Sequence, residues 1–101
     1  MVLGKMIAFS VGKGMTQNER TKFTRHFFGY TDKSNYKKYS YYREGWLDKF
    51  PHIKPIKSLI IMRKEDSERT IEYLRKFDAE LFVRDVVLSK EDEVTLGIKE
   101  E

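Results

Sequence analysis

Alternating and continuous apolar runs predict three β-strands. Alternation over Met6–Val11 places Ile7 and Phe9 on one face of an extended segment, which is the pattern of a half-buried strand. The continuous apolar run Leu59–Met62 is typical of a central strand. The segment Leu81–Leu88 is rich in β-forming residues and predicts a further strand.

A capping signal predicts the first helix. Thr16 is followed three residues later by Glu19, which is the capping-box pattern that satisfies free N–H groups at a helix start. Gly29 is the predicted end, because glycine tolerates the left-handed conformation in which helices often stop. The core side of this helix is predicted to carry Phe23, Phe27 and Tyr30.

Two further helical segments are predicted in the second half of the chain. Asp66 or Ser67 is the expected cap of the first. Ser89 with Asp92 is expected to open one final helical turn that ends near Gly97. The apolar stripe of the longer helix is predicted to consist of Ile71, Leu74 and Phe77.

The remaining segments complete the predicted topology. Asp32–Asn35 has turn chemistry, Tyr36–Trp46 reads as an exposed edge strand, and the stretch around Pro51 and Pro55 reads as a connection. The order is therefore β-α-β-β-α-β, which predicts an α+β, ferredoxin-like fold: a four-stranded antiparallel sheet with two helices on one face. A single domain is expected over residues 1–98, with a frayed acidic end at residues 99–101.

The predicted sheet has more apolar surface than two helices can cover. Helices on one face leave the other face open, yet Leu59–Met62 is apolar on both faces and Met6 and Ala8 oppose Ile7 and Phe9. An exposed apolar sheet face usually marks an interface, so a homodimer is expected, through sheet faces or edges. The alternative is a monomer with a few exposed aliphatic side chains.

Composition narrows the class of protein. The 101 residues include no cysteine, which excludes disulfides and thiolate metal sites. No run approaches the roughly 18 apolar residues of a membrane span, and the N-terminus reads as a strand rather than a signal peptide, so a cytoplasmic location is expected. Charged residues make up 36% of the chain. This proportion, with few Asn and Gln, resembles heat-adapted proteins.

Charge and aromatic residues are both distributed unevenly. Met1–Lys64 holds 14 Lys or Arg against 4 Asp or Glu, whereas Glu65–Glu101 holds 6 against 12. Ten of the fourteen aromatic residues lie within Phe23–Phe50, interleaved with Lys and Arg. Cations for phosphates and rings for bases are what nucleic-acid binding requires. Two alternatives stay open: a core with a solvated basic face, and a docking surface for a protein partner without nucleic-acid affinity.

The basic and aromatic segment, residues 20–50, supplies the candidate binding residues. DNA or RNA, duplex included, is the expected partner. The predicted phosphate contacts are Lys22, Arg25, Lys33, Lys37, Lys38 and Arg43. The tyrosines available for stacking or groove contacts are Tyr39, Tyr41 and Tyr42.

No complete catalytic or metal-binding constellation is present, so no cofactor and no catalytic residue is predicted. His26 and His52 do not stand at metal-ligand spacing from another strong ligand. Asp32 and Asp48 are the carboxylates that a metal-dependent nuclease would use, which is the least supported hypothesis. Gly12-Lys13-Gly14 lacks the spacing of a Walker A loop and reads as a strand-to-helix turn.

The first half of the chain resembles the Cas2-type ferredoxin-like proteins of CRISPR adaptation. The resemblance covers the opening strand Met6–Val11, the basic helix from Arg20 to the aromatic-Gly pair at Phe28–Gly29, and Tyr39–Gly45, which resembles that family's strand ending in Gly. Family members carry an Asp at the end of strand one for metal, whereas this chain has Ser10, Val11 and Gly12. The resemblance implies a dimer that binds duplex nucleic acid without nuclease activity.

Overall fold

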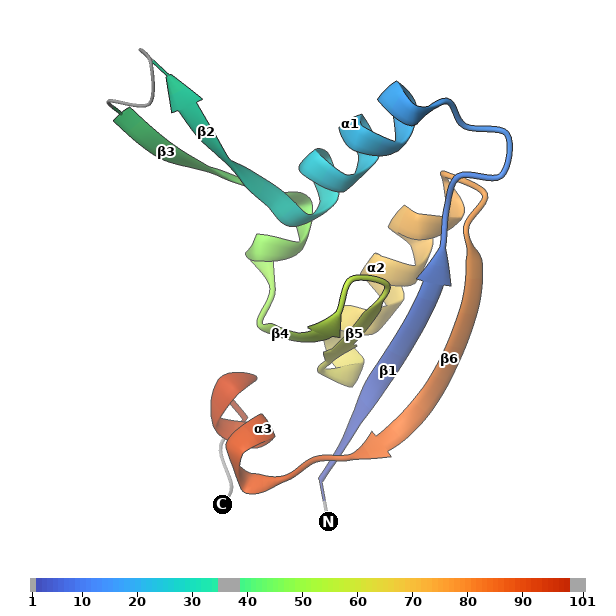
Figure 1. The fold of residues 1–101 in the computed structure, drawn as a ribbon. Coiled ribbons are helices and arrows are strands. Elements are labelled where there is room, and N and C mark those ends of the chain that lie inside the picture. Colours follow the sequence, from blue (N-terminus) through green and yellow to red (C-terminus); the bar gives the residue numbers. More distant parts are fainter. Residues whose placement is uncertain (1, 35–38, 99–101) are drawn as a thin grey trace. The chain divides into compact units, whose positions relative to one another are not determined.

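A computed structural model of the protein describes residues 2–34 and 39–98. Contacts between residues divide the chain into two units. The sheet unit consists of Met1–Val11 and Phe50–Glu101, and the hairpin unit is Gly12–Lys49. The elements, labelled in Figure 1, are β1 (Leu3–Ser10), α1 (Gln17–Phe28), β2 (Gly29–Ser34), β3 (Tyr39–Glu44), the 3-10 helix η1 (Trp46–Lys49), β4 (His52–Ile56), β5 (Leu59–Met62), α2 (Lys64–Arg75), β6 (Glu80–Val87) and α3 (Lys90–Thr95).

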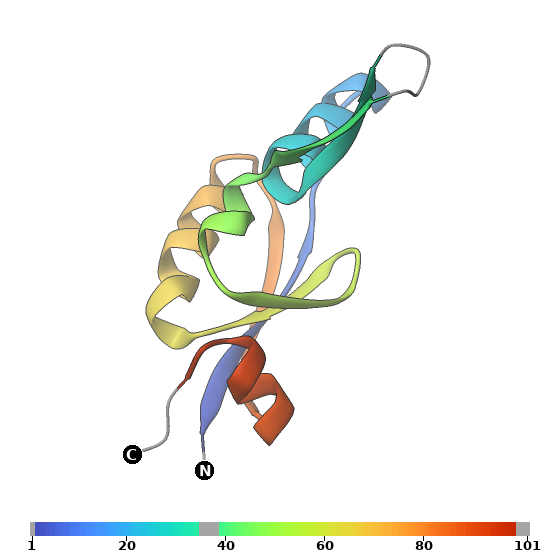
Figure 2. The same ribbon diagram turned by 90° about the vertical axis from the view of Figure 1, so that its left-hand side faces the viewer.

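The sheet unit is built on a four-stranded antiparallel sheet in the order β4-β5-β1-β6. Ile7 of β1 lies opposite Ile60 of β5 and Val83 of β6. Helix α2 packs against β1 and covers one face, as Figures 1 and 2 show together. Ile7, Ile60 and Leu74 are fully buried and form the core between helix and sheet. The predicted α+β class with a four-stranded antiparallel sheet is therefore confirmed, as are the strands over Met6–Val11, Leu59–Met62 and Leu81–Leu88, within two or three residues at their ends.

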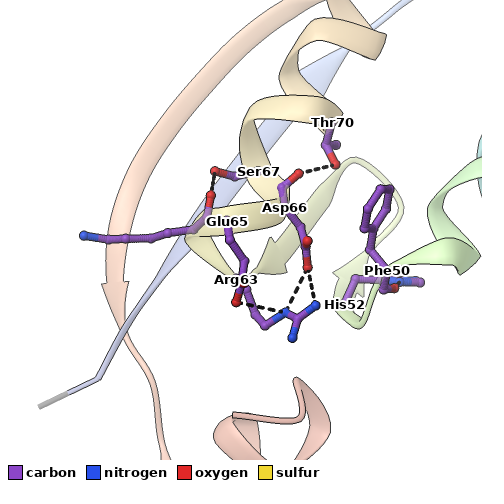
Figure 3. A network of polar contacts seen from close by, with 8 residues as sticks. Phe50, His52, Arg63, Glu65, Asp66, Ser67 and Thr70 are labelled. Atoms are coloured by element: carbon purple, nitrogen blue, oxygen red, sulfur yellow. Dashed lines mark hydrogen bonds and ion pairs between the residues drawn. The ribbon is translucent and has the colours of Figure 1, made fainter.

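Helix α2 starts earlier than predicted, with an N-cap three residues before Asp66. Its N-cap position is Arg63, which makes no side-chain cap bond. The guanidinium of Arg63 instead holds the Asp66 carboxylate at 2.8 and 2.9 Å, and the Ser67 hydroxyl donates to the Lys64 carbonyl at 2.7 Å (Figure 3). Because Asp66 and Ser67 bind within the first turn, neither is free to cap it, and the sequence expectation for this start was wrong. On the predicted stripe, Leu74 is fully buried and Ile71 and Phe77 are half-buried.

The edge strand next to β5 is β4, not the segment predicted for that place. The sequence analysis assigned Tyr36–Trp46 to the second strand of the sheet and treated the Pro51–Pro55 stretch as a connection; both expectations were wrong. Proline lacks the N–H of a ladder bond but is tolerated on an edge strand or at a bulge. Pro55 lies where the pairing between Ile53 and Ile56 shifts register, which explains why the strand was not recognised.

The hairpin unit starts with the predicted helix. The Thr16 hydroxyl accepts from the Glu19 N–H at 3.2 Å, and the Glu19 carboxylate accepts from the Thr16 N–H at 3.3 Å, so the capping box is confirmed. Gly29 ends α1 as predicted, with φ 81° and its N–H bonded to the Arg25 carbonyl.

A second, two-stranded sheet follows α1 directly. Strands β2 and β3 pair antiparallel from Gly29↔Glu44 to Ser34↔Tyr39. Tyr30 therefore lies in β2 and not on the helix, which corrects its predicted place in the helical stripe. Asp32, predicted in a turn, is also in β2, while Asn35 lies outside the described residues. The reason is Gly29, because a residue with positive φ turns the chain out of the helix at once.

Stacked rings form the core of the hairpin unit. Phe27 is fully buried, with its ring 5.5 Å from Phe23 and 6.1 Å from Trp46, both stacked. Helix η1 contacts α1 and adds the fully buried Leu47. The predicted core role of Phe23 and Phe27 is confirmed.

A short helix closes the described chain. Ser89 and Asp92 form the predicted capping box, with bonds of 3.1 and 3.2 Å, and α3 packs against β4. None of the helices in residues 2–34 and 39–98 has the length and apolar character needed to cross a membrane. The predicted frayed end, residues 99–101, lies outside the described residues.

Candidate nucleic-acid interface

The structure describes five of the nine predicted contact side chains, all in the hairpin unit. Lys22 and Arg25 lie on α1, and Tyr41, Tyr42 and Arg43 lie on β3. All five are exposed. The other four are Lys33 and Tyr39, whose strands but not side chains are described, and Lys37 and Lys38, which lie outside the described residues.

The basic side chains of α1 include one, Arg25, that contacts the β2–β3 hairpin. Lys22 and Arg25 stand three residues apart, so their side chains are neighbours on the helix. The Arg25 guanidinium lies over the Tyr30 ring, 4.8 Å from its centroid. This cation–π contact joins the end of α1 to the first residues of β2.

One face of the hairpin carries alternating rings and charges. Tyr30 lies opposite Arg43, and Asp32 lies opposite Tyr41. Because side chains alternate along a strand, these four share one face. Arg43 and Tyr41 are 61% (side chain) and 53% exposed. Arg43 reaches the Asp32 carboxylate at 3.4 Å, a long and exposed ion pair of little strength. Together with Arg25, which lies over the Tyr30 ring, and Lys22, its neighbour on α1, this surface is called the basic aromatic face.

Tyr42 points to the opposite side of the hairpin. Its hydroxyl donates to the Asp48 carboxylate at 2.6 Å and lies 3.0 Å from the Phe28 carbonyl oxygen. The same Asp48 oxygen accepts from the Gly45 N–H at 2.8 Å. The hydrogen bond to Asp48, with desolvation as the second cause, raises the pKa of Tyr42 to about 12. Tyr42 is thus anchored at its hydroxyl, whereas 57% of the residue stays exposed.

Asp48→Asn is expected to bring the Tyr42 pKa back toward its ordinary value of 10.0. The folded pKa is raised, so the hydrogen bonds of Tyr42 stabilise the hairpin unit fully below about pH 10 and are lost as pH rises through about 12. The measurement is phenolate absorbance against pH, with the Tyr42→Phe curve subtracted.

Glu44→Gln is the matched control, because Glu44 raises the same pKa only through its charge and is the smallest cause. A Tyr42 pKa that responds equally to both substitutions would contradict the hydrogen bond.

Two glycines allow the backbone after β3 to lie close against the end of α1 and the start of β2. A Cβ on Gly45 would fall against the Gly29 nitrogen and the Phe27 and Phe28 backbone. A Cβ on Gly29 would lie 2.5 Å from the Tyr42 hydroxyl oxygen and 2.6 Å from the Arg43 carbonyl oxygen. This close approach of the two backbones sets the position of β3 beside the end of α1.

The two candidate metal ligands, Asp32 and Asp48, contact other protein groups. The Asp48 carboxylate accepts two hydrogen bonds, and that of Asp32 faces Arg43. Over the described ranges, no group of three or more His, Asp or Glu side chains is placed to hold a metal ion. His26 is exposed, and the His52 ring nitrogen lies 2.9 Å from the Phe50 carbonyl oxygen.

The turn before α1 is fixed by an arginine of the helix. Arg20 donates to the Gly12 carbonyl at 3.0 Å, and a Cβ on Gly12 would meet this side chain. Lys13 is exposed. The segment has the contacts of a strand-to-helix turn.

The second face of the four-stranded sheet is apolar and partly exposed. Phe82 is 50% exposed, and Ile56 is 62% exposed. A shallow hollow of about 380 Å³ lies between them, lined also by Ala8, Leu59 and Glu80. The expected excess of apolar sheet surface is therefore present in the sheet unit.

Sequence reasoning missed Tyr30 and Asp32 as members of the basic aromatic face. Tyr30 was assigned to the helix and Asp32 to a turn. The predicted stop at Gly29 already placed Tyr30 beyond the helix, so a strand starting there could have been inferred. The ion pair of Asp32 with Arg43 required the strand register, which no local pattern gives.

No protein family model matches the chain, and no curated protein and no solved structure matches it either.

Proposed function

We propose that the protein is a non-catalytic, dimeric nucleic-acid-binding protein that binds through its hairpin unit. The observation that carries this proposal is the basic aromatic face, on which exposed cations alternate with tyrosine rings. Phosphates are bound by Lys and Arg, and bases stack on flat side chains. The face lies on three consecutive elements, α1, β2 and β3, and consists of Lys22, Arg25, Tyr30, Tyr41 and Arg43.

The division into units supports an anionic partner for the hairpin unit. Gly12–Lys49 contains nine Lys or Arg residues against four Asp or Glu. The sheet unit contains eleven against twelve, so its net charge is close to zero. A localised positive field of this kind steers polyanions to one part of a protein.

The sheet order supports a ferredoxin-like origin for the sheet unit. When β1, β4, β5 and β6 are taken as the four strands of a β-α-β-β-α-β chain, the order β4-β5-β1-β6 corresponds to that arrangement. The β2–β3 hairpin is then an insertion between α1 and the second strand. Kinship with the Cas2-type family stays a prediction from the sequence.

The test is fluorescence anisotropy of labelled single- and double-stranded DNA and RNA at two salt concentrations. We expect binding that survives near-physiological salt and weakens steeply as salt rises. Arg43→Gln should weaken binding by about five- to tenfold and lower the salt slope by about one contact, since one phosphate contact is lost. Asp32→Asn should tighten binding, because it removes a negative charge and releases Arg43.

Arg75→Gln, on an exposed site of α2 in the sheet unit, is the matched control. Charge reversal of Lys37 and Lys38 tests the predicted contacts that the structure does not describe. Binding that is absent, or that responds equally to Arg43→Gln and Arg75→Gln, would overturn the proposal and favour a protein docking surface. Divalent-dependent cleavage abolished by Asp32→Ala or Asp48→Ala would instead show a nuclease.

A further inference from the structure

Strand β6 forms one end of the four-stranded sheet and pairs, among the described strands, with β1 alone (Figure 1). It is eight residues long, which is a long edge for a sheet of this size. An unpaired edge presents a row of backbone donors and acceptors that can join another strand. The backbone groups of β6 that point outward decide how another strand can pair with it.

Two hydrogen bonds fix the phase of the ladder. The Phe9 N–H donates to the Ser58 carbonyl at 2.9 Å, so odd-numbered residues of β1 point their backbone groups at β5. The Leu88 N–H donates to the Val2 carbonyl at 2.9 Å, so even-numbered residues of β1 and β6 bond to each other. Because backbone direction alternates along an antiparallel strand, the groups of Leu81, Val83 and Asp85 point to the open edge.

The side chains between these outward groups form a symmetric set. Glu80, Phe82 and Arg84 lie on the same face of β6, with opposite charges two residues to either side of Phe82. We propose that β6 pairs with β6 of a second copy of this chain, antiparallel and centred on Phe82. Phe82 then meets Phe82, and each Glu80 meets the other copy's Arg84. This proposal rests on the dimer in the proposed function and assigns its interface.

The backbone accepts this register. Leu81 of one copy lies opposite Val83 of the other, and the outward groups of both exchange hydrogen bonds. The pairs at Phe82 and at Glu80–Arg84 fall on the non-hydrogen-bonded positions, where side chains approach more closely. Opposite charges directly across two strands stabilise the pair, whereas like charges destabilise it.

Neighbouring registers are excluded by their side-chain pairs. Only shifts that keep odd residues opposite odd residues preserve the hydrogen bonds. Centring on Arg84 places Arg84 against Arg84. Centring on Val83 places Leu81 against Asp85, and centring on Leu81 places Phe82 against Glu80. The Phe82 register alone, of these four, matches both charges and apolar groups.

In the single chain, the Arg84 side chain occupies a backbone carbonyl at the open edge of β6. Its guanidinium donates to the Val83 carbonyl at 2.7 Å and lies 3.8 Å from the centroid of the Phe82 ring. In the paired form the second copy's Leu81 N–H takes over the Val83 carbonyl, and Arg84 turns to the second copy's Glu80. Both side chains are exposed in the single chain, so this exchange needs no rearrangement of the core.

The test is a charge exchange read by sedimentation velocity. Glu80→Arg and Arg84→Glu should each raise the dimer dissociation constant by about tenfold or more, because each places like charges at two positions of the interface. A mixture of the two variants should form a heterodimer at the concentrations at which the wild type dimerises. In that heterodimer each Arg lies opposite a Glu of the other variant. The double variant should dimerise like the wild type. Glu72→Arg, exposed on α2, is the control and should change nothing.

The outcomes separate this inference from the proposed function. A wild-type dimer indifferent to both single variants, or a mixture that forms no heterodimer, overturns the β6 interface and leaves the dimer standing. A wild-type protein that is monomeric at all concentrations overturns both. Concentration-dependent protection of the Leu81 and Val83 amides from hydrogen exchange gives an independent check, because only edge pairing protects these groups. Nucleic-acid binding is measured separately through Arg43→Gln in the hairpin unit.

Discussion

Replacing Phe27 by alanine is expected to lower the free energy of unfolding of the hairpin unit by about 3–5 kcal/mol. Phe27 is fully buried and contacts the rings of Phe23, Phe28 and Trp46. The unit has 38 residues, and Phe23 and Leu47 are the other buried apolar side chains among its described residues, so the loss of this ring removes a large part of its core. We expect the variant unit to be largely unfolded without denaturant.

Urea denaturation followed by tryptophan fluorescence measures this effect. Trp46 is the only tryptophan and stacks on Phe27, so its emission reports on the hairpin unit. Tyr41→Ala is the control: Tyr41 is 53% exposed, and its loss should cost no more than about 1 kcal/mol. Equal urea midpoints for the two variants would contradict the assignment of Phe27 to the core.

Gly45→Ala is expected to cost about 3 kcal/mol or more, at the upper end of the range for overpacking. The new methyl group would fall against the backbone of Phe27, Phe28 and Gly29, and backbone atoms cannot turn aside as a flexible side chain does. Relief requires separation of β3 from the end of α1. If the proposed nucleic-acid binding is present, we expect the variant to lose it together with stability.

Gly14→Ala is the matched control for this effect. Gly14 has φ 81° and nothing within 4 Å of an added Cβ. Its substitution measures the cost of a left-handed alanine alone, about 1–2 kcal/mol. If Gly14→Ala destabilises the protein as much as Gly45→Ala does, backbone strain and not the close approach of the strands limits the hairpin unit.

Local signals predicted the elements that depend on local chemistry. The capping boxes at Thr16–Glu19 and Ser89–Asp92 and the helix stop at Gly29 were all read correctly, because a hydroxyl, a carboxylate or a glycine acts on its own few residues. The buried strand β5 was equally clear from its continuous apolar run.

The pairing of strands was the part of the fold that local signals could not supply. Tyr39–Glu44 has the composition of an edge strand, and its partner was misjudged because β2 (GYTDKS) is polar and contains turn-forming residues. The strand β4 was hidden by Pro55, since a proline lowers the expectation of a strand unless its edge position is known. Tyr30 and Asp32 were missed as members of the basic aromatic face, because the register decides which side chains share a face.

The place of β1 in the chain has a consequence for synthesis. β1 leaves the ribosome before its partners β5 and β6, which begin at Leu59 and Glu80. The hairpin unit is complete once Lys49 has emerged. Its contacts join residues that are close in the sequence, and contacts of this kind favour rapid folding. The apolar strand Leu3–Ser10 therefore stays unpaired until β5 has been made, and is paired on both sides only after β6. Before β5 emerges, the nascent protein holds a finished hairpin unit next to an unpaired strand, which is the kind of segment that chaperones bind.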